Sequence, residues 1–308
     1  VMFGFYTTHE APFRHLYFTG LVRDEKGAKM SKSKGNGIDV LQAIDRFGAD
    51  AVRLSLVLGT TPGLDFNLSD EKIETFRNFA NKLWNIGRYI ETQSTANSKD
   101  RPALETRSDA DRWILERTEA VAKEVTRLLE NHQISLAGET LRAFTWDDFA
   151  DWYVEVHKIE KNDALLRHAF DTILKLWHPF IPFVTEAIHQ TLRLDRSEFL
   201  MIAEWPTHSK ASVVGRPVSD SNSGTIENEN RFELVKDLIV KIRNIRSVYH
   251  IDPGLKMIVS ARDGSERTIR DNEEVFKRLA RVSEVQTAGA DTPEHTLLIQ
   301  SGLLQVLL

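Results

Sequence analysis

Apolar residues recur at helical spacing along most of the chain, a pattern that predicts a mainly α-helical protein. Two short helices are expected at 39–47 and 49–58, with Gly48 between them. A long helix is expected at about 70–91, where Ser69 occupies the N-cap position and acidic residues lie in or near the first turn. Four more helical patterns follow and predict an antiparallel bundle. They cover residues 108–131, 134–158, 161–177 and 182–193.

The C-terminal part of the chain has a different pattern. Residues 207–230 are rich in Ser, Gly, Asn and Pro and predict a linker. An amphipathic helix is expected at 231–250, with Arg246 on its buried side, where an arginine is expected to form a pair or to snorkel. A small α+β module is predicted after the linker, with this helix as its first element. Its other elements are strands at 257–261, 284–288 and 296–299 and a helix at 272–280.

A lysine-rich stretch near the start of the chain carries the first candidate chemistry. An apolar strand predicted at 16–22 leads into residues 24–37, which we call the lysine loop and which contain four lysines within nine residues. Its glycines let the backbone approach a ligand closely, and its lysines supply compact positive charges. Such a loop after a strand fits a clamp for nucleotide phosphates. Composition alone favours the alternative, a solvated charged turn.

The long helix carries the second candidate. Two neighbouring stripes on its polar side interleave cations, aromatic rings and amides. Single-stranded RNA loops are bound by such groups, because cations meet phosphates, rings stack on bases and amides contact base edges. The alternative is an ordinary solvated face with Trp84 at the rim of the core. The stripes are Asn78, Lys82, Asn85 and Tyr89, and Arg77, Asn81, Trp84 and Arg88.

Composition limits the class of protein. With 308 residues, 41% of them hydrophobic and 28% charged, the chain is typical of a soluble globular protein of about two domains or three small ones. No apolar run approaches the roughly 20 residues of a membrane span, and no signal peptide opens the chain. The absence of cysteine excludes disulfides and thiolate metal sites and fits a cytoplasmic protein. Because the net charge is −5, an RNA surface must be a local basic patch.

Several stretches together resemble one family. The Lys-Met-Ser-Lys-Ser sequence at 29–33 is similar to a signature of class I aminoacyl-tRNA synthetases. Residues 48–53, 77–85, 146–153 and 178–186 resemble the valyl-tRNA synthetase family. The resemblance runs in order through nearly the whole chain, which a single short motif does not supply.

The resemblance implies a domain organisation. Residues 1–68 are expected to form a remnant of a Rossmann-type catalytic domain, with the lysine loop and the start of stem-contact helices. Residues 69–206 are expected to hold the long connecting helix and an antiparallel anticodon-binding bundle. The linker at 207–230 and the α+β module at 231–308 follow. No His-x-Gly-His sequence occurs among the 10 histidines, so we expect a C-terminal fragment that begins inside the catalytic domain and stops before a coiled coil.

The resemblance also implies roles. The parent reaction converts ATP, valine and tRNA(Val) to valyl-tRNA, AMP and pyrophosphate. Lys32 is expected to hold the leaving pyrophosphate, with Lys29 beside it, and Ser31 and Ser33 are expected to shape the ATP-binding loop. The residues expected at the anticodon are Lys82, Arg88, Tyr89 and Val154, the last as an apolar contact to a base.

Partners and alternatives follow from the same resemblance. ATP is expected with Mg²⁺, no metal is expected to be held by this chain itself, and a monomer without membrane contact is expected. The chain alone is expected to bind tRNA but not to aminoacylate it. Two alternatives stay open, a free-standing anticodon-binding module and a fragment of an isoleucyl- or leucyl-tRNA synthetase. Residues 77–85 and the lack of a cysteine-rich zinc module favour the valyl family over the isoleucyl family.

Overall fold

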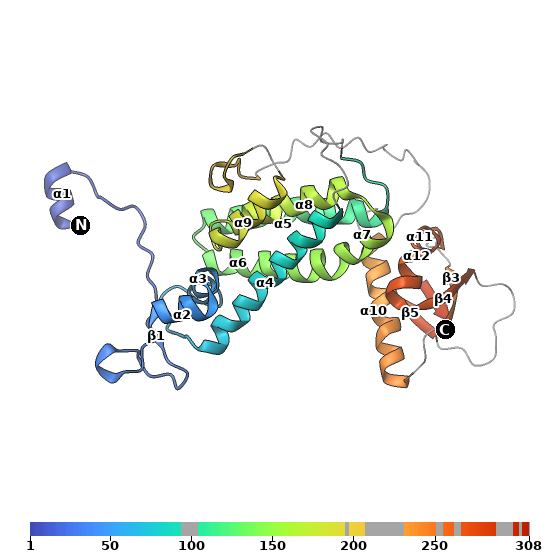
Figure 1. The fold of residues 1–308 in the computed structure, drawn as a ribbon, viewed down its shortest axis with the longest axis horizontal. Helices are drawn as coiled ribbons and strands as arrows, with labels where there is room; N and C mark the ends of the chain where they lie inside the picture. The colour runs from blue at the N-terminus through green and yellow to red at the C-terminus, as the bar shows by residue number, and fades with distance from the viewer. Residues whose placement is uncertain are drawn as a thin grey trace. The chain divides into compact units, whose positions relative to one another are not determined.

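A computed structural model describes most of the chain and shows a mainly helical protein (Figure 1). Two compact units can be distinguished. The first comprises Val1–Gln93, Val121–Phe144 and Asp171–His208, and the second comprises Ser94–Ala120, Thr145–Phe170 and Ser209–Leu308. The described residues are 1–93, 104–194, 197–206, 231–250, 255–261, 266–287, 298–301 and 304–307.

The helices of the first unit begin and end where the sequence places its caps. The Asp39 carboxylate accepts hydrogen bonds from the backbone N–H groups of Leu41 at 2.9 Å and Gln42 at 3.1 Å. Gly48, at a φ of 89°, separates the two helices predicted at 39–47 and 49–58. At the start of the long helix, Ser69 Oγ accepts from Lys72 N at 3.1 Å. These contacts confirm the predicted cap at Ser69 and the predicted break at Gly48, and the structure adds Asp39 as a cap. The helices are α1 Met2–Thr8, α2 Val40–Phe47, α3 Ala49–Val57, α4 Asp70–Gln93, α6 Ile134–Ala143 and α9 Pro182–Leu192.

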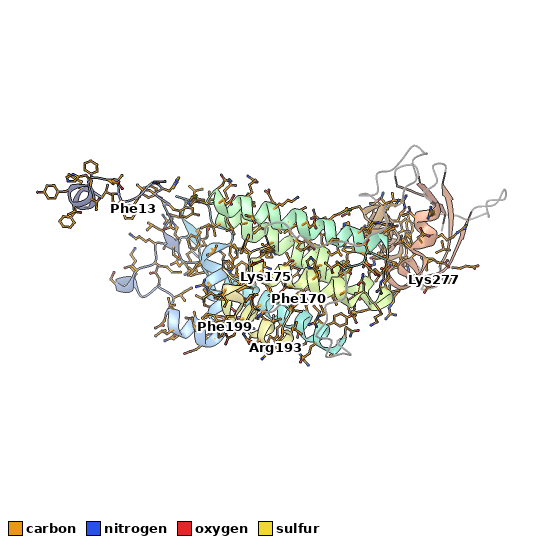
Figure 2. All side chains as sticks on the ribbon, turned by 90° about the horizontal axis from the view of Figure 1, so that it is seen from above. Phe13, Phe170, Lys175, Arg193, Phe199 and Lys277 are labelled. Carbon is orange, nitrogen blue, oxygen red and sulfur yellow. The ribbon has the colours of Figure 1, made fainter. Side chains whose placement is uncertain are left out.

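The predicted strand at 16–22 is wrong over most of its length. Only β1, Val22–Arg23, is a strand, and it pairs in parallel with β2, Phe66–Asn67. The residues before it form an extended segment that leads away from the helices to α1 (Figure 1). Phe13 on this segment is 62% exposed (labelled in Figure 2). A strand needs a hydrogen-bonded neighbour, and β2 supplies one for only two residues.

Helix α4 buries one face within the first unit. Phe79 belongs to this core, and its ring lies 4.9 Å from that of Trp177. A Cβ on Gly87 would lie 3.0 Å from Cγ2 of Ile188, so α4 and α9 approach closely at this point. The other buried residues of α4 are Ile73, Phe76, Leu83, Ile86 and Ile90.

The bundle helices match the predicted pattern, with one difference. The pattern at 134–158 contains a ten-residue π-helical stretch, η2, within an otherwise α-helical run. In the second unit the ring of Phe149, on η2, stacks at 5.9 Å on that of Phe170 (labelled in Figure 2). The apolar pattern predicts a helix here but does not specify its hydrogen bonding, which in a π stretch runs i→i+5 in place of i→i+4. The bounds are α5 Asp109–Glu130, η2 Phe144–Tyr153, α7 Val154–Glu160 and α8 Asp163–Trp177.

The C-terminal part of the second unit is an α+β module, as predicted. Helix α10, Arg231–Tyr249, packs against β5 and η5. Arg246 Nη1 donates to Ala280 O at 2.6 Å and to Arg281 O at 3.2 Å, which confirms that this arginine pairs within the fold. The predicted linker at 207–230 lies outside the described residues. The remaining helices are α11 Glu266–Asp271, α12 Glu273–Val275 and η5 Phe276–Ala280.

The module contains one four-stranded sheet with the order β4-β3-β6-β5. Its central strand β3 pairs in parallel with β4 and antiparallel with β6. Within the described helices, none is long and apolar enough to cross a lipid bilayer. The strands are β3 Leu255–Ala261, β4 Val282–Thr287, β5 Leu298–Ser301 and β6 Leu304–Leu307.

Candidate functional site

The lysine loop begins with a tight turn that brings the chain back beside β1. Asp24 N donates to Ala28 O and Gly27 N donates to Asp24 O, each at 2.9 Å. Gly27 has a φ of 77°, a conformation that glycine adopts without a steric penalty. Met30 N then donates to Val22 O at 3.2 Å. The Lys-Met-Ser-Lys-Ser segment therefore starts from a fixed point on the strand.

The serines close the next part of the loop. Lys32–Lys34 form one 3₁₀ turn, η1, in which Lys34 N donates to Ser31 O at 3.2 Å. The hydroxyl oxygens of Ser31 and Ser33 lie 2.8 Å apart in a hydrogen bond. The expected role of the two serines in shaping an ATP-binding loop stays a prediction. Lys29 is exposed. The Lys32 side chain lies outside the described side chains, so its role stays a prediction.

Two residues that the sequence did not single out hold this loop. Asn36 donates from Nδ2 to Asp24 Oδ2 at 2.8 Å and accepts at Oδ1 from Ser31 N at 2.9 Å. The hydrogen bond from Asn36, followed by that from the Ala28 N–H, lowers the pKa of Asp24 below its ordinary value. The sequence shows Asn36 beside a glycine in a charged loop, which is typical of a turn. It does not show the partner of Asn36, because Asp24 lies 12 residues away.

An ion pair fixes the strand that precedes the loop. Arg23 Nε donates to Asp65 Oδ2 at 2.7 Å, and Leu21 N donates to Asp65 Oδ1 at 2.8 Å. The Leu21 N–H, followed by the Arg23 side chain, lowers the pKa of Asp65. Asp65 therefore stays ionised at neutral pH and joins the two strands that support the lysine loop.

The polar side of α4 presents most of the groups predicted to meet RNA. Asn78, Asn81, Asn85 and Arg88 are exposed, and Trp84 is 39% exposed. These residues follow one another along the helix, so they form a continuous amide, aromatic and cationic surface.

Three other residues of these stripes are partly buried. Lys82 and Tyr89 are half-buried and lie about two helical turns apart along the same side of α4. Arg77 is half-buried and donates to Glu74 at 2.8 Å, with its guanidinium 5.8 Å from the Phe47 ring centre. Arg77 is therefore engaged within the fold, whereas the surface from Asn78 to Arg88 remains the candidate RNA-binding face.

Val154 belongs to the second unit and is the first residue of α7. Its side chain is only 7% exposed. An apolar contact from Val154 to a base would have to use this small exposed part, and the assignment stays a prediction.

A further set of hydrogen bonds connects α3 with the start of α9. Asp50 accepts from Phe183 N at 3.3 Å and from Val184 N at 2.7 Å. Arg53 donates from Nε to Phe180 O at 3.0 Å and from Nη2 to Pro179 O. Burial raises the pKa of Asp50, although these N–H groups oppose the shift. The sequence stretches 48–53 and 178–186 thus meet in space and fix the connecting helices to the bundle.

Comparisons with known proteins agree with this geometry. Residues 1–69 match the family described as tRNA synthetases class I (I, L, M and V). Residues 111–261 match the anticodon-binding domain of tRNA ligase. The chain belongs to the class I aminoacyl-tRNA synthetases. The lysine loop lies in the part that matches the first family, and the bundle lies in the part that matches the second.

The relatives of this synthetase chain include many valine–tRNA ligases. It is 35% identical over 298 residues to that of Clostridium acetobutylicum, covering 92% of this chain and 32% of the relative. It is 36% identical over 290 residues to that of Corynebacterium glutamicum, covering 89% of this chain and 30% of the relative. The chain thus spans about a third of the length of these curated relatives.

A solved structure supports the fold of the synthetase chain. The leucyl-tRNA synthetase of Agrobacterium radiobacter K84 agnB2, in a ternary complex with tRNA and LeuAMS, aligns with a TM-score of 0.54 at 25% identity. The alignment covers 64% of this chain and 24% of that structure. The mainly helical architecture after a catalytic-domain segment is therefore shared with an enzyme of the same class.

Proposed function

We propose that this chain is the part of a valine–tRNA ligase that contacts the ATP phosphates and the tRNA anticodon arm. The observation that carries the proposal is its identity to valine–tRNA ligases over 89–92% of its length, through the loop and the bundle alike. A free-standing anticodon-binding module would not account for the lysine loop. A leucyl or isoleucyl enzyme remains the second candidate, because the solved relative is a leucyl-tRNA synthetase.

The proposed first step joins valine to ATP. A carboxylate oxygen of valine attacks the α-phosphorus, and the bond from that phosphorus to the bridging oxygen of pyrophosphate breaks. Lys32 and Lys29 would meet the negative charge that moves onto the leaving pyrophosphate. The Ser31 and Ser33 hydroxyls would hold the loop around the phosphates. Mg²⁺ would arrive with ATP on its phosphate oxygens, and we assign no residue of this chain to it.

The second step would transfer the valyl group to tRNA(Val). Arg88 and Lys82 would meet phosphates of the anticodon loop, and Tyr89 would stack on a base. Val154 would add an apolar contact. Action as a monomer in the cytoplasm belongs to the same proposal.

The proposal is tested by amino-acid-dependent exchange of pyrophosphate into ATP, in the complete synthetase that contains this sequence. Valine is expected to support exchange far better than isoleucine or leucine. Equal or better exchange with leucine or isoleucine would instead identify the second candidate. No exchange with any of the three would contradict a synthetase role.

The role of Lys32 has a sharper test in the same assay. Lys32→Ala is expected to lower the rate of valyl-adenylate formation by about 10²-fold or more, because its charge is best used in the transition state. The KM for valine should change little. Lys26→Ala is the matched control, since Lys26 lies in the preceding turn and has no assigned role. An effect of Lys32→Ala confined to the KM for valine would remove Lys32 from the pyrophosphate site.

A further inference from the structure

Asn36 uses both atoms of its side-chain amide within the lysine loop. Its Oδ1 accepts from Ser31 N at 2.9 Å, and its Nδ2 donates to Lys29 O at 3.3 Å. These two backbone groups flank Met30, in the centre of the segment expected to bind ATP. The same Nδ2 donates to Asp24 Oδ2 at 2.8 Å. One side chain thus ties the backbone of the lysine segment to the turn that precedes it.

Asp24 extends this connection to the turn. Its Oδ1 accepts from Lys26 N at 3.0 Å and from Ala28 N at 2.8 Å, while Oδ2 accepts from Asn36. The carboxylate is therefore hydrogen-bonded on both oxygens, and its lowered pKa keeps it ionised at neutral pH. A hydrogen bond to an ionised carboxylate is stronger than one between neutral groups.

We propose that Asn36 and Asp24 are positioning residues, which hold the backbone at Lys29 and Ser31 where the lysine loop meets the phosphates of ATP. The inference rests on the proposed function, because it concerns the same loop. Neither residue is placed on the substrate; both act through the backbone of the lysine segment.

The chemistry of the amide explains why asparagine stands at this position. The site needs one acceptor for the Ser31 N–H and one donor for the Asp24 carboxylate and the Lys29 carbonyl. Asparagine supplies both, whereas a carboxylate at position 36 offers only acceptors and would lie against the ionised Asp24. Lysine side chains are flexible, so the placement of their charges depends on a fixed backbone. A misplacement of about 1 Å can cost about 10²-fold in rate.

The first experiment tests the connection in this chain without ATP. Hydrogen exchange of the Ser31 amide, followed by NMR, reports directly on its bond to Asn36. Asn36→Ala is expected to accelerate this exchange by about 5- to 10-fold, the effect of losing one hydrogen bond. Asn131→Ala is the control, because Asn131 directly follows the last residue of α5 and its Nδ2 donates to the backbone carbonyl of Arg127, away from the lysine loop. Unchanged Ser31 exchange in Asn36→Ala would overturn the inference.

The second experiment measures pyrophosphate exchange in the complete synthetase. Asn36→Ala and Asn36→Asp are each expected to lower kcat by about 10- to 100-fold while the KM for valine stays unchanged. Asp24→Asn should act in the same direction, because an amide at position 24 has only one oxygen acceptor. If that oxygen accepts from the backbone N–H groups of Lys26 and Ala28, the amide nitrogen at position 24 faces Asn36 Nδ2, and both are donors. Glu25→Gln, a matched charge change at an exposed neighbour, should leave kcat unchanged.

Exchanging the two residues tests whether the hydrogen bond between positions 24 and 36 carries the effect on kcat. In Asp24→Asn/Asn36→Asp, the amide at position 24 can donate to the carboxylate at position 36, which can still accept from Ser31 N. Only the longer contact to Lys29 O is lost. The double variant is expected to recover at least about 5-fold of the kcat lost in Asn36→Asp.

The outcomes separate this inference from the proposed function. A wild-type enzyme that shows valine-dependent exchange, with position 36 variants that keep wild-type kcat, would overturn the inference alone. A wild-type enzyme that shows no valine-dependent exchange would overturn the proposed function, and the ATP-positioning inference with it. Faster Ser31 exchange, lower kcat at constant KM for valine and recovery in the double variant would together establish the positioning role.

Discussion

In the second unit, Asp109 and Asp111 at the start of α5 and Glu160 at the end of α7 show how single side chains set the pH dependence of stability. Asp111 accepts from Tyr153 Oη at 2.9 Å and from Asn162 Nδ2 at 2.6 Å, so its charge is well satisfied. The Glu160 carboxyl group, at the end of α7, accepts a hydrogen bond from the Ser108 hydroxyl at 2.5 Å. Burial, and then the nearby charges of Asp111 and Asp109, raise the pKa of Glu160 to about 7 despite this bond.

The raised pKa gives a signed prediction. Between about 4.5 and 7 the folded chain binds a proton at Glu160 that the unfolded chain has released, so the free energy of unfolding falls as pH rises through this window. Glu160→Gln cannot ionise and keeps an acceptor for Ser108. At pH 8 it is expected to be more stable than the wild type by on the order of 2 kcal/mol, and near pH 4.5 by almost nothing.

Urea denaturation at pH 4.5, 6 and 8 measures this difference. The lowered pKa of His157 also contributes to the pH dependence, but it is common to both proteins and cancels in the comparison. Glu130→Gln, at an exposed position at the end of α5, is the control and should show no such pH dependence. A stability gain that is the same at all three pH values would contradict the assignment of the raised pKa to Glu160.

At the scale of elements, close approach between helices of the first unit depends on small residues. Gly138 lies in α6, where a Cβ would come within 2.8 Å of Leu58 Cδ1 and 3.3 Å of Phe180 Cε1. Both neighbours are buried, Leu58 at 0% and Phe180 at 5% exposure, so they have little room to move. The backbone of Phe180 is also held by Arg53 of α3. α6 therefore packs where only glycine fits.

Gly138→Ala is expected to destabilise the chain by about 1–3 kcal/mol. Overpacking against two fixed side chains outweighs the gain of about 1 kcal/mol that alanine brings to a helix. Gly37→Ala is the matched control, because nothing lies within 4 Å of its Cβ position and its φ is not in the left-handed region. Thermal unfolding of both variants gives the comparison, and a stabilised Gly138→Ala would show that Leu58 can repack.

At the scale of the whole molecule, charge predicts how RNA binding responds to salt. The chain carries a net charge of −5, so attraction to tRNA must come from a local surface such as the α4 face. Two or three phosphate contacts imply a slope of about −2 for log K against log salt, at ~0.7 per phosphate of a single strand. Lys82→Ala and Arg88→Ala are each expected to reduce this slope by about 0.7.

Tyr89→Ala should behave differently, since stacking carries no counterion. It is expected to weaken binding by about 1–3 kcal/mol at every salt concentration without changing the slope. Lys123→Ala, an exposed lysine on α5, should leave both quantities unchanged. The measurement is a salt series of titrations with valine tRNA and with the same tRNA carrying an altered anticodon. Equal binding of both tRNAs, unaffected by any α4 variant, would assign α4 a purely structural role.

The sequence by itself determined the helices, their caps and the two candidate surfaces. Helix spacing, the Ser69 cap and the break at Gly48 act between residues a few positions apart, so they can be read along the chain. The signature at 29–33 likewise marks its own family without a structure. The residues predicted on the exposed side of α4 follow from the same helical period.

Only the tertiary structure decided which residues meet. It placed Phe79 in the core of α4 and buried Val154 to 7% exposure. It left only Val22 of the predicted strand at 16–22 paired with β2. It also brought Asn36 to Asp24, 12 residues away. Burial, pairing and hydrogen bonding between distant residues depend on partners that the local pattern does not contain, and this is why the sequence pattern alone could not supply them.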